Sequence, residues 1–183
     1  LNRPAIAPVG EARTNTDIFR ALAQRDLSSV YDASFGIGHD VRQWRKNWSF
    51  AASYAAQPQG GGVLLDLCHE LDMACTLLPA LAVRDVTSLG HAAFPGVDFV
   101  TRIALDGAGQ LGTVAMDYLS PVSFRRIVLR GTGIVADFDL IAGRYRLQDG
   151  QGAQDLSFPF ERNEMFLAAM RDFLHLVAGR PVS

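Results

Sequence analysis

The sequence predicts an α+β domain in which two or three helices cover one face of an open, mainly antiparallel sheet of about six strands. Residues 83–149 support the sheet, because they form short runs rich in β-branched and aromatic side chains, separated by Gly, Pro, Asp or Ser. Segments 62–78 and 163–179 support the helices, because their apolar residues recur at helical spacing. The length of 183 residues suits one domain, and we expect residues 1–183 to form it.

The strands are expected to pair mostly with their neighbours in the chain. DGAGQ (106–110) is typical of a tight hairpin, and LSPVS (119–123) and RGTG (130–133) are typical of turns. Strands joined this briefly pair antiparallel, because a parallel pair needs a crossover of a dozen or more residues. Several strands carry apolar residues at both parities, which predicts a partly apolar outer face that contacts a partner. The predicted strands are 28–38, 83–94, 97–105, 111–119, 124–131, 133–140 and 144–149.

GGGVLLDLCHELD (60–72) opens a helix that we expect to run to Leu78 and to stop at Pro79. A second helix, NEMFLAAMRDFLHLVAG (163–179), ends at a glycine. A short third helix, containing Ile18 and Phe19, would follow Thr14 as its N-cap. The expected core-facing residues of the first helix are Leu64, Cys68, Leu71, Cys75 and Leu78. The residues expected on its opposite side are Asp66, His69, Glu70 and Met73.

Composition excludes several classes of function. A net charge of −2 argues against a nucleic-acid surface, which needs a concentrated basic patch. No apolar run approaches the length of a membrane span, and no signal peptide opens the sequence. Cys68 and Cys75 lie seven residues apart on one predicted helix, about 10 Å along its axis, which is too far for a disulfide. They are interpreted as buried thiols in a reducing compartment, which indicates the cytoplasm.

Asp66 and His69 have three possible roles. A zincin motif would need a second histidine at position 73, where Met73 stands, and a catalytic metal site has at least three protein ligands, so no metal is expected. A histidine beside a carboxylate can act as a general acid or base, because its pKa lies near neutrality. A solvated helix face is the structural alternative. The residues alone leave the last two open.

The residues around this helix carry further signals. Gly60, Gly61 and Gly62 either expose N–H groups to an anion or allow close approach to other protein backbone. Trp44 and Tyr54 lie in the long segment 39–59, where aromatic rings serve as sugar-like ligand contacts or as loop anchors. The G-x-G-x-x-A pattern at 131–136 is not followed by a helix, so it is interpreted as a hairpin turn and the chain lacks its own Rossmann unit.

Trp44-Arg45, Ser53-Tyr54-Ala55-Ala56 and GGGVLLDLCHELD together resemble the C-terminal domain of the glucose–fructose oxidoreductase, inositol dehydrogenase and MocA family. Residues 111–139 and 163–179 are similar to later parts of that domain, and the resemblance covers about residues 10–180. It implies an oxidoreductase that uses NAD or NADP, held mainly by an N-terminal Rossmann domain absent from this chain. The chain is then expected to be a substrate-binding and oligomerisation domain, cut at both ends and inactive alone.

The resemblance also implies roles for single residues. His69 matches the catalytic histidine and Asp66 the acid that partners it. The substrate would be a small hydroxylated molecule such as a sugar or polyol, and the open sheet face would form a homodimer or homotetramer. The alternative is a non-catalytic ligand-binding or oligomerisation module, which needs no acid–histidine pair. Substrate contacts are assigned to Trp44, Arg45, Tyr54 and Arg13, and cofactor contacts to Gly60 and Gly61.

Overall fold

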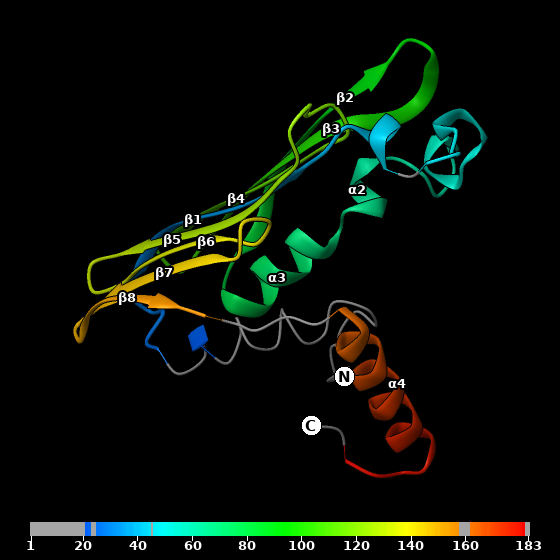
Figure 1. Cartoon of the computed structure of the whole chain (residues 1–183). Coiled ribbons are helices and arrows are strands. Elements are labelled where there is room, and N and C mark those ends of the chain that lie inside the picture. The colour runs from blue at the N-terminus through cyan, green and yellow to red at the C-terminus, as the bar shows by residue number, and fades with distance from the viewer. Residues whose placement is uncertain (1–20, 23–24, 45, 158–161, 182–183) are drawn as a thin grey trace. The chain divides into compact units, whose positions relative to one another are not determined.

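The computed structural model describes residues 21–22, 25–44, 46–157 and 162–181. The chain divides into two units, residues 27–157 and the paired terminal segments 1–26 and 158–183, and each is described by itself. The second unit contains α4 (Arg162–Val177), which confirms the helix predicted at 163–179 (Figure 1). Most of the short helix predicted after Thr14, including Ile18 and Phe19, lies outside the described residues. Residues 21–22 of that segment are described and helical, and Leu22, also expected on its apolar side, is buried.

The first unit is built on one sheet of eight strands, so the prediction of about six strands was too low. The strand that the sequence did not reveal is β8, whose residues GAQDL include no β-branched or aromatic side chain. The strands follow one another across the sheet in the order β2-β3-β4-β1-β5-β6-β7-β8. Their bounds are β1 Val30–Gly38, β2 Ala82–His91, β3 Phe94–Gly107, β4 Gln110–Asp117, β5 Phe124–Gly131, β6 Val135–Asp139, β7 Arg144–Asp149 and β8 Gly152–Leu156.

Strand β1 lies between β4 and β5, parallel to β4, while every other described pair is antiparallel. The chain leaves β1, passes through residues 39–81 and returns at the edge as β2, and two hairpin connections then bring β4 beside β1. The link from β4 to β5 crosses the end of β1, where a Cβ on Gly38 would stand 2.5 Å from Asp117 Oδ2. The ends of β1 and β4 therefore meet, and the His39 N–H donates to the Asp117 carbonyl at 3.2 Å.

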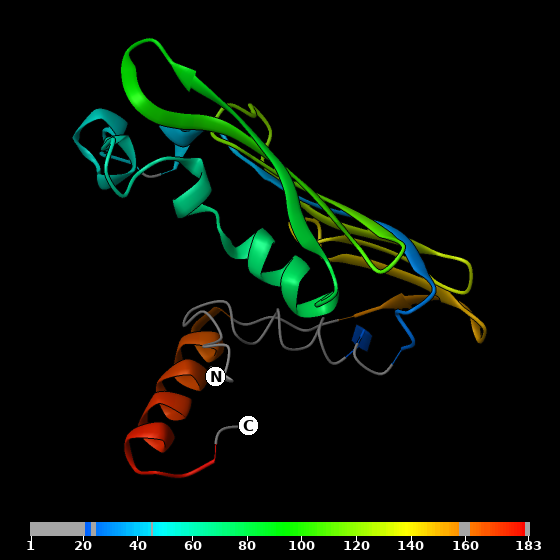
Figure 2. The same ribbon diagram turned by 180° about the vertical axis from the view of Figure 1, so that it is seen from behind.

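Helices α2 (Val63–Asp66) and α3 (His69–Leu77) cover one face of this sheet (Figures 1 and 2). Helix α3 contacts β1 and β4, whereas α2 contacts β3 and β4. Side chains alternate along the strands, so that one set faces the helices and is buried. The inner face of the central strands is formed by Phe35, Ile103, Val114, Ile127, Leu129, Ala136, Phe138 and Leu147.

The helix predicted at 62–78 is two helices separated at Leu67 and Cys68, and of the five residues predicted on its apolar face only Leu78 is buried. Both cysteines are exposed, so the inference of buried thiols fails and the cytoplasm stays a prediction without that argument. Glu70 and Met73, expected on the solvent side, are fully buried instead. The break shifts which residues face the sheet, and a charged partner makes the burial of Glu70 possible.

That partner is Arg125 on β5, whose guanidinium Nε lies 2.5 Å from Glu70 Oε1. Arg125 pairs with Ile37 of β1 and thus points to the inner face, next to α3. The Glu70 side chain is 1% exposed and that of Arg125 is 13% exposed. An ion pair removed from water in this way is sensitive to the loss of one partner, since the other charge would stay buried.

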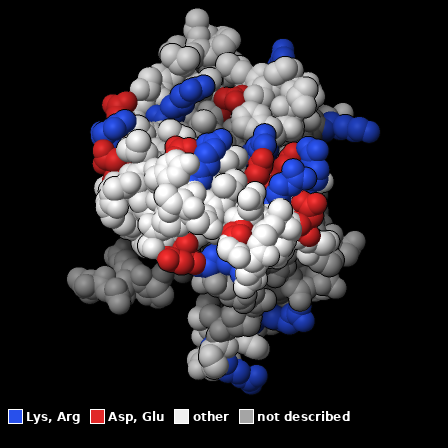
Figure 3. Space-filling view, turned by 90° about the vertical axis from the view of Figure 1, so that its left-hand side faces the viewer, with Lys and Arg blue, Asp and Glu red and all other residues white. Residues whose placement is uncertain are grey.

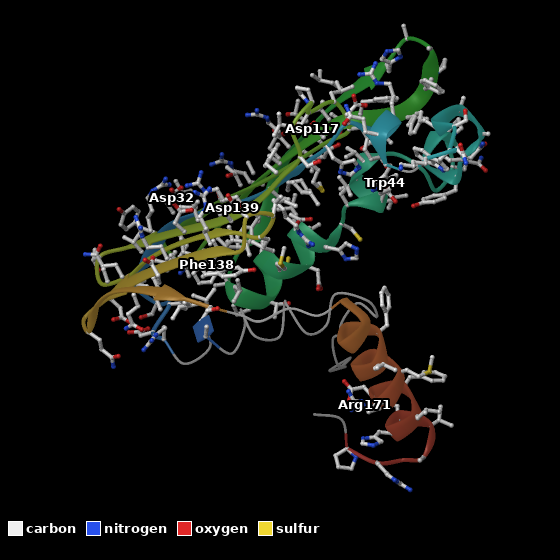
Figure 4. All side chains as sticks on the ribbon, viewed as in Figure 1. Asp32, Trp44, Asp117, Phe138, Asp139 and Arg171 are labelled. Atoms are coloured by element: carbon white, nitrogen blue, oxygen red, sulfur yellow. The ribbon has the colours of Figure 1, made fainter. Side chains whose placement is uncertain are left out.

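The outer face of the sheet carries ion pairs and small uncharged residues. Strands β1 and β5–β8 carry a row of intramolecular ion pairs, and Figure 3 shows such positive and negative side chains lying next to one another with uncharged surface between them. Small uncharged residues, among them Gly36, Ala104 and Ala115, occupy the middle of this face. Figure 4 labels two outer residues, Asp32 and Asp139, and the buried inner residue Phe138.

None of the helices in the described part of the chain has the length and hydropathy of a membrane span.

Replacing Arg125 by Met should lower the free energy of unfolding by about 3 kcal/mol, because Glu70 would keep its burial and lose its guanidinium partner. Arg126→Met is the matched control: the adjacent Arg126 forms an exposed pair with Asp137, and its loss should cost less than about 1 kcal/mol. Urea unfolding of the chain measures both values. Equal, small losses in the two variants would contradict the burial of Glu70.

Candidate active site

Two of the glycines before α2, Gly61 and Gly62, are explained by close contact with protein, whereas a Cβ on Gly60 would meet no atom within 4 Å. A Cβ on Gly61 would stand 2.5 Å from the Gln57 carbonyl oxygen, and Gly62 has a φ of +88°, which disfavours any other residue. The N–H groups of Gly61 and Gly62 donate to the carbonyls of Gln57 and Ala55 at 3.2 and 3.0 Å. These two donors are therefore used within the protein, and cofactor contacts by Gly60 and Gly61 stay a prediction.

Asp98, from β3, holds the start of α2 against the sheet. Its Oδ2 accepts the Leu64 N–H at 2.9 Å and the Thr101 hydroxyl at 2.9 Å. The carboxylate thereby satisfies one of the N–H groups that a helix leaves free at its first turn. This contact fixes the position of α2, whose last residue is Asp66.

The Asp66 carboxylate accepts a hydrogen bond from a tyrosine at each oxygen. The Tyr54 hydroxyl donates to Oδ1 at 2.6 Å, and the Tyr118 hydroxyl donates to Oδ2 at 2.8 Å. The Tyr118 hydroxyl also lies 3.1 Å from the Gly62 carbonyl oxygen. Burial, with the hydrogen bond to Asp66 as a second cause, raises the pKa of Tyr118, so this phenol remains a donor at physiological pH. The pair Tyr54 and Asp66 was predicted to share a site, and the structure brings them together.

An aromatic cluster surrounds Tyr118. The rings of Phe50 and Phe99 lie 5.7 and 5.9 Å from it, edge-on, and Trp44 and His39 lie 6.4 and 6.0 Å from it. Residues 39–59 contribute most of these rings through three short 3-10 helices, η1 (Val41–Gln43), η2 (Phe50–Ala52) and η3 (Tyr54–Ala56). Trp44 follows η1 and is partly exposed, and Figure 4 marks it. We call the rings around Tyr118, those of His39, Trp44, Phe50 and Phe99, the aromatic wall of the site.

His39 is a titratable group in this cluster that the sequence did not single out. Its ring centre lies 4.9 Å from that of Trp44, with the two rings tilted by 34°, and its Nε2 is buried with no hydrogen-bond partner among the residues that the structure describes. Burial lowers the pKa of His39, and the negative charges of Asp66, Asp117 and Asp40 oppose this shift. His39 is therefore a neutral imidazole near neutral pH, and the charge of Asp66 acts on it.

His69 begins α3, three residues after Asp66, and is partly exposed. Within the described residues no hydrogen bond joins His69 to Asp66, and the helix breaks between them. The catalytic assignment of the two residues stays a prediction. Arg13 and Arg45, the other predicted substrate contacts, lie outside the described residues.

Three residues of this site were not found from the sequence: Tyr118, His39 and Asp98. Tyr118 and His39 each follow the end of a strand, at β4 and β1, which is a usual place for ligand-binding residues. That signal was available only once β4 and β1 were known to be parallel neighbours. In the described ranges no group of three or more His, Cys, Asp or Glu side chains is placed to hold a metal ion.

The described residues also provide no cradle for a dinucleotide. The pattern at 131–136 forms the turn between β5 and β6, as predicted, and the Gly131 N–H donates to the Ile134 carbonyl at 2.7 Å. No helix begins there to receive a diphosphate. The glycine pattern at 131–136 therefore does not place a helix N-terminus against a cofactor diphosphate.

No protein-family model and no curated protein sequence matches this chain. Several solved structures have a similar fold at low sequence identity. An inositol dehydrogenase homolog complexed with NAD+ from Azotobacter vinelandii is 14% identical with a TM-score of 0.70, over 96% of this chain and 57% of its own. An oxidoreductase from Agrobacterium radiobacter, in complex with NAD+, L-tartaric acid and magnesium, is 17% identical with a TM-score of 0.70, over 94% and 54%.

Levoglucosan dehydrogenase, in complex with NADH and levoglucosan, is 13% identical with a TM-score of 0.75, over 96% of this chain and 58% of its own. The chain therefore spans little more than half the length of these structures. At such identities the similarity concerns the fold, and the chain has a fold found within these NAD(H)-bound oxidoreductase structures.

Proposed function

We propose that this chain is the C-terminal, substrate-binding domain of an NAD- or NADP-dependent oxidoreductase of the glucose–fructose oxidoreductase, inositol dehydrogenase and MocA family. The substrate is a sugar, a polyol or a similar hydroxylated small molecule. The observation that carries the proposal is the Asp66 carboxylate, which two phenols hold beside an aromatic wall on a fold found in such dehydrogenase structures. The motifs GGGVLLDLCHELD and Trp44-Arg45 support the same family.

The chemistry assigned to this chain is binding, orientation and proton transfer. Asp66 accepts hydrogen bonds from hydroxyl groups, as its two tyrosine partners illustrate, and a substrate hydroxyl is a donor of the same kind. His69 serves as the general acid or base, with Asp66 as its electrostatic partner. Substrate contacts are assigned to Trp44 and Tyr54, while those of Arg45 and Arg13 stay predictions from the sequence.

The cofactor is bound by another part of the full-length protein. When bound, its nicotinamide supplies the acceptor or donor of the hydride. We expect this chain not to turn over substrate by itself, because a rate of this kind depends largely on orienting both reactants and the cofactor is held elsewhere. We place the enzyme in the cytoplasm.

The outer sheet face is proposed to join two or four copies of the enzyme. Arginine and aspartate alternate on it, so the same surface on a second copy can provide opposite charges under a two-fold axis. The uncharged residues in the middle of the face provide area that two copies can pack together. A non-catalytic module would use this face as well, so the test of catalysis must come from Asp66 and His69.

His69→Ala and Asp66→Asn, made in the full-length protein, should each lower kcat of NAD(P)-linked turnover by about 100-fold or more, because each removes a group that handles the substrate proton. Circular dichroism checks that the variants fold. His175→Ala is the control, since His175 lies on α4 and has no part in the candidate site, and its activity should match the wild type. Full activity of both test variants would favour the non-catalytic module.

Asp66→Asn should lower the pKa of His39 further, because Asp66 is the carboxylate that most strongly raises it. Titration of the imidazole carbon-bound protons by NMR in chain 1–183 measures the shift. Asp149→Asn is the control, because Asp149 is not among the carboxylates that act on His39, and it should leave the pKa of His39 unchanged. An unchanged value in Asp66→Asn would show that Asp66 carries no charge near His39.

The lowered pKa of His39 also makes the free energy of unfolding depend on pH. The unfolded chain binds a proton at His39 near the ordinary pKa of about 6.5, before the folded chain does. The free energy of unfolding should therefore fall as pH decreases from 7 toward the lowered pKa. His39→Gln should weaken this dependence, and urea unfolding between pH 5 and 7 measures it. An identical pH dependence in the variant would contradict the shift.

Val128→Arg should convert the chain to monomers, because Val128 lies on the outer face between Ser34 and Asp137. Thr76→Arg, on the exposed side of α3, is the control and should leave the assembly intact. Light scattering of chain 1–183 at increasing concentration gives the mass. A monomeric wild-type chain at high concentration, or an unchanged mass in Val128→Arg, would contradict assembly through this face.

A further inference from the structure

We propose that the two oxygens of the Asp66 carboxylate have different tasks: Tyr118 anchors Oδ2, while Oδ1 receives the substrate hydroxyl at the position that the Tyr54 hydroxyl now occupies. This inference rests on the proposed function and deepens it, because it names the atom that meets the substrate. It makes Tyr118 a positioning residue and makes Tyr54 a group that the substrate displaces.

The hydrogen bond from Tyr118 to Asp66 Oδ2 is held in place by the burial of Tyr118. Tyr118 is fully buried, and Phe50 and Phe99 pack edge-on against its ring. Its hydroxyl lies within hydrogen-bond distance of Asp66 Oδ2 and of the Gly62 carbonyl oxygen, so it ties together the first and last parts of α2. A substrate could take this place only by opening the core and leaving a buried polar group without a partner, which is costly.

The contact at Oδ1 can be exchanged. The Tyr54 side chain is 61% exposed, while the backbone that carries it is held by η3, where the Gln57 N–H donates to the Tyr54 carbonyl at 3.0 Å. Only the side chain has to turn, and exposed side chains change rotamer within nanoseconds. A substrate hydroxyl that replaces the phenol donates to the same oxygen, so the carboxylate keeps its number of hydrogen bonds.

The aromatic rings on the Tyr118 side of Asp66 suit a hydroxylated substrate. Trp44 is partly exposed, and its ring centre lies 6.4 Å from that of Tyr118, whose hydroxyl bonds the same carboxylate. An aromatic ring of this kind packs on the C–H face of a sugar or polyol, while the carboxylate accepts from its hydroxyl. The buried phenol at Oδ2 then fixes the direction in which Oδ1 points.

Tyr54→Phe and Tyr118→Phe form a matched pair, because each removes one hydroxyl from the same carboxylate. Both are made in the full-length protein and assayed with a substrate that the wild type turns over with NAD or NADP. Tyr118→Phe should lower kcat about 10- to 100-fold, because a loosened carboxylate misplaces the reacting hydroxyl. Tyr54→Phe should keep kcat within about twofold and lower KM, because the substrate no longer competes with the phenol.

A kcat loss in Tyr54→Phe as large as that in Tyr118→Phe would overturn the division of tasks, and so would an unchanged kcat in Tyr118→Phe. A purely structural role for Tyr118 would lower the fraction of active enzyme and its Tm, which active-site titration separates from kcat. Should Tyr118→Phe not fold, the values of kcat and KM in Tyr54→Phe decide the matter alone. A wild type that turns over no hydroxylated substrate would count against the proposed function itself, which keeps the two failures distinct.

Discussion

The candidate site depends on one constraint, the parallel pairing of β1 with β4 in a sheet that is otherwise antiparallel. Parallel neighbours end at the same edge, so His39 and Tyr118 emerge side by side, and the link from β4 to β5 closes over Gly38. The Tyr118 hydroxyl then reaches Asp66 and the backbone of Gly62. Without this pairing the phenol, the imidazole and the carboxylate would lie on separate parts of the sheet.

Residues 39–81 form a long connection because they join β1 to β2, which lies three strands away at the edge of the sheet. This connection carries aromatic residues of the site, both short helices and Glu70, which pairs with Arg125 on β5. Close approach of backbone to backbone at Gly61, and of α2 to Asp98, holds this connection on the inner face. Residues 39–81 thus contain both the contacts that hold the fold together and the residues of the candidate site.

The sequence predicted the fold class, helix α4, most strands and the turn at 131–134, because each rests on local patterns of periodicity and turn residues. It failed where tertiary contacts decide. Glu70 is buried because Arg125, 55 residues away, provides its counter-charge, and no local pattern contains that information. The break at Leu67 shifted the phase of the helix, so Cys68 and Met73 exchanged their expected environments. For the site, the sequence singled out Asp66 and Tyr54 but missed Tyr118, since its importance arises from strand order.

The most direct measurement is a crystal structure of the full-length protein with its cofactor and a hydroxylated substrate. The account predicts a substrate hydroxyl oxygen about 3 Å from Asp66 Oδ1, the Tyr54 hydroxyl moved away from that oxygen, and the bond from Tyr118 to Oδ2 intact. A substrate bound away from Asp66, with both tyrosine contacts unchanged from those at 2.6 and 2.8 Å, would contradict it.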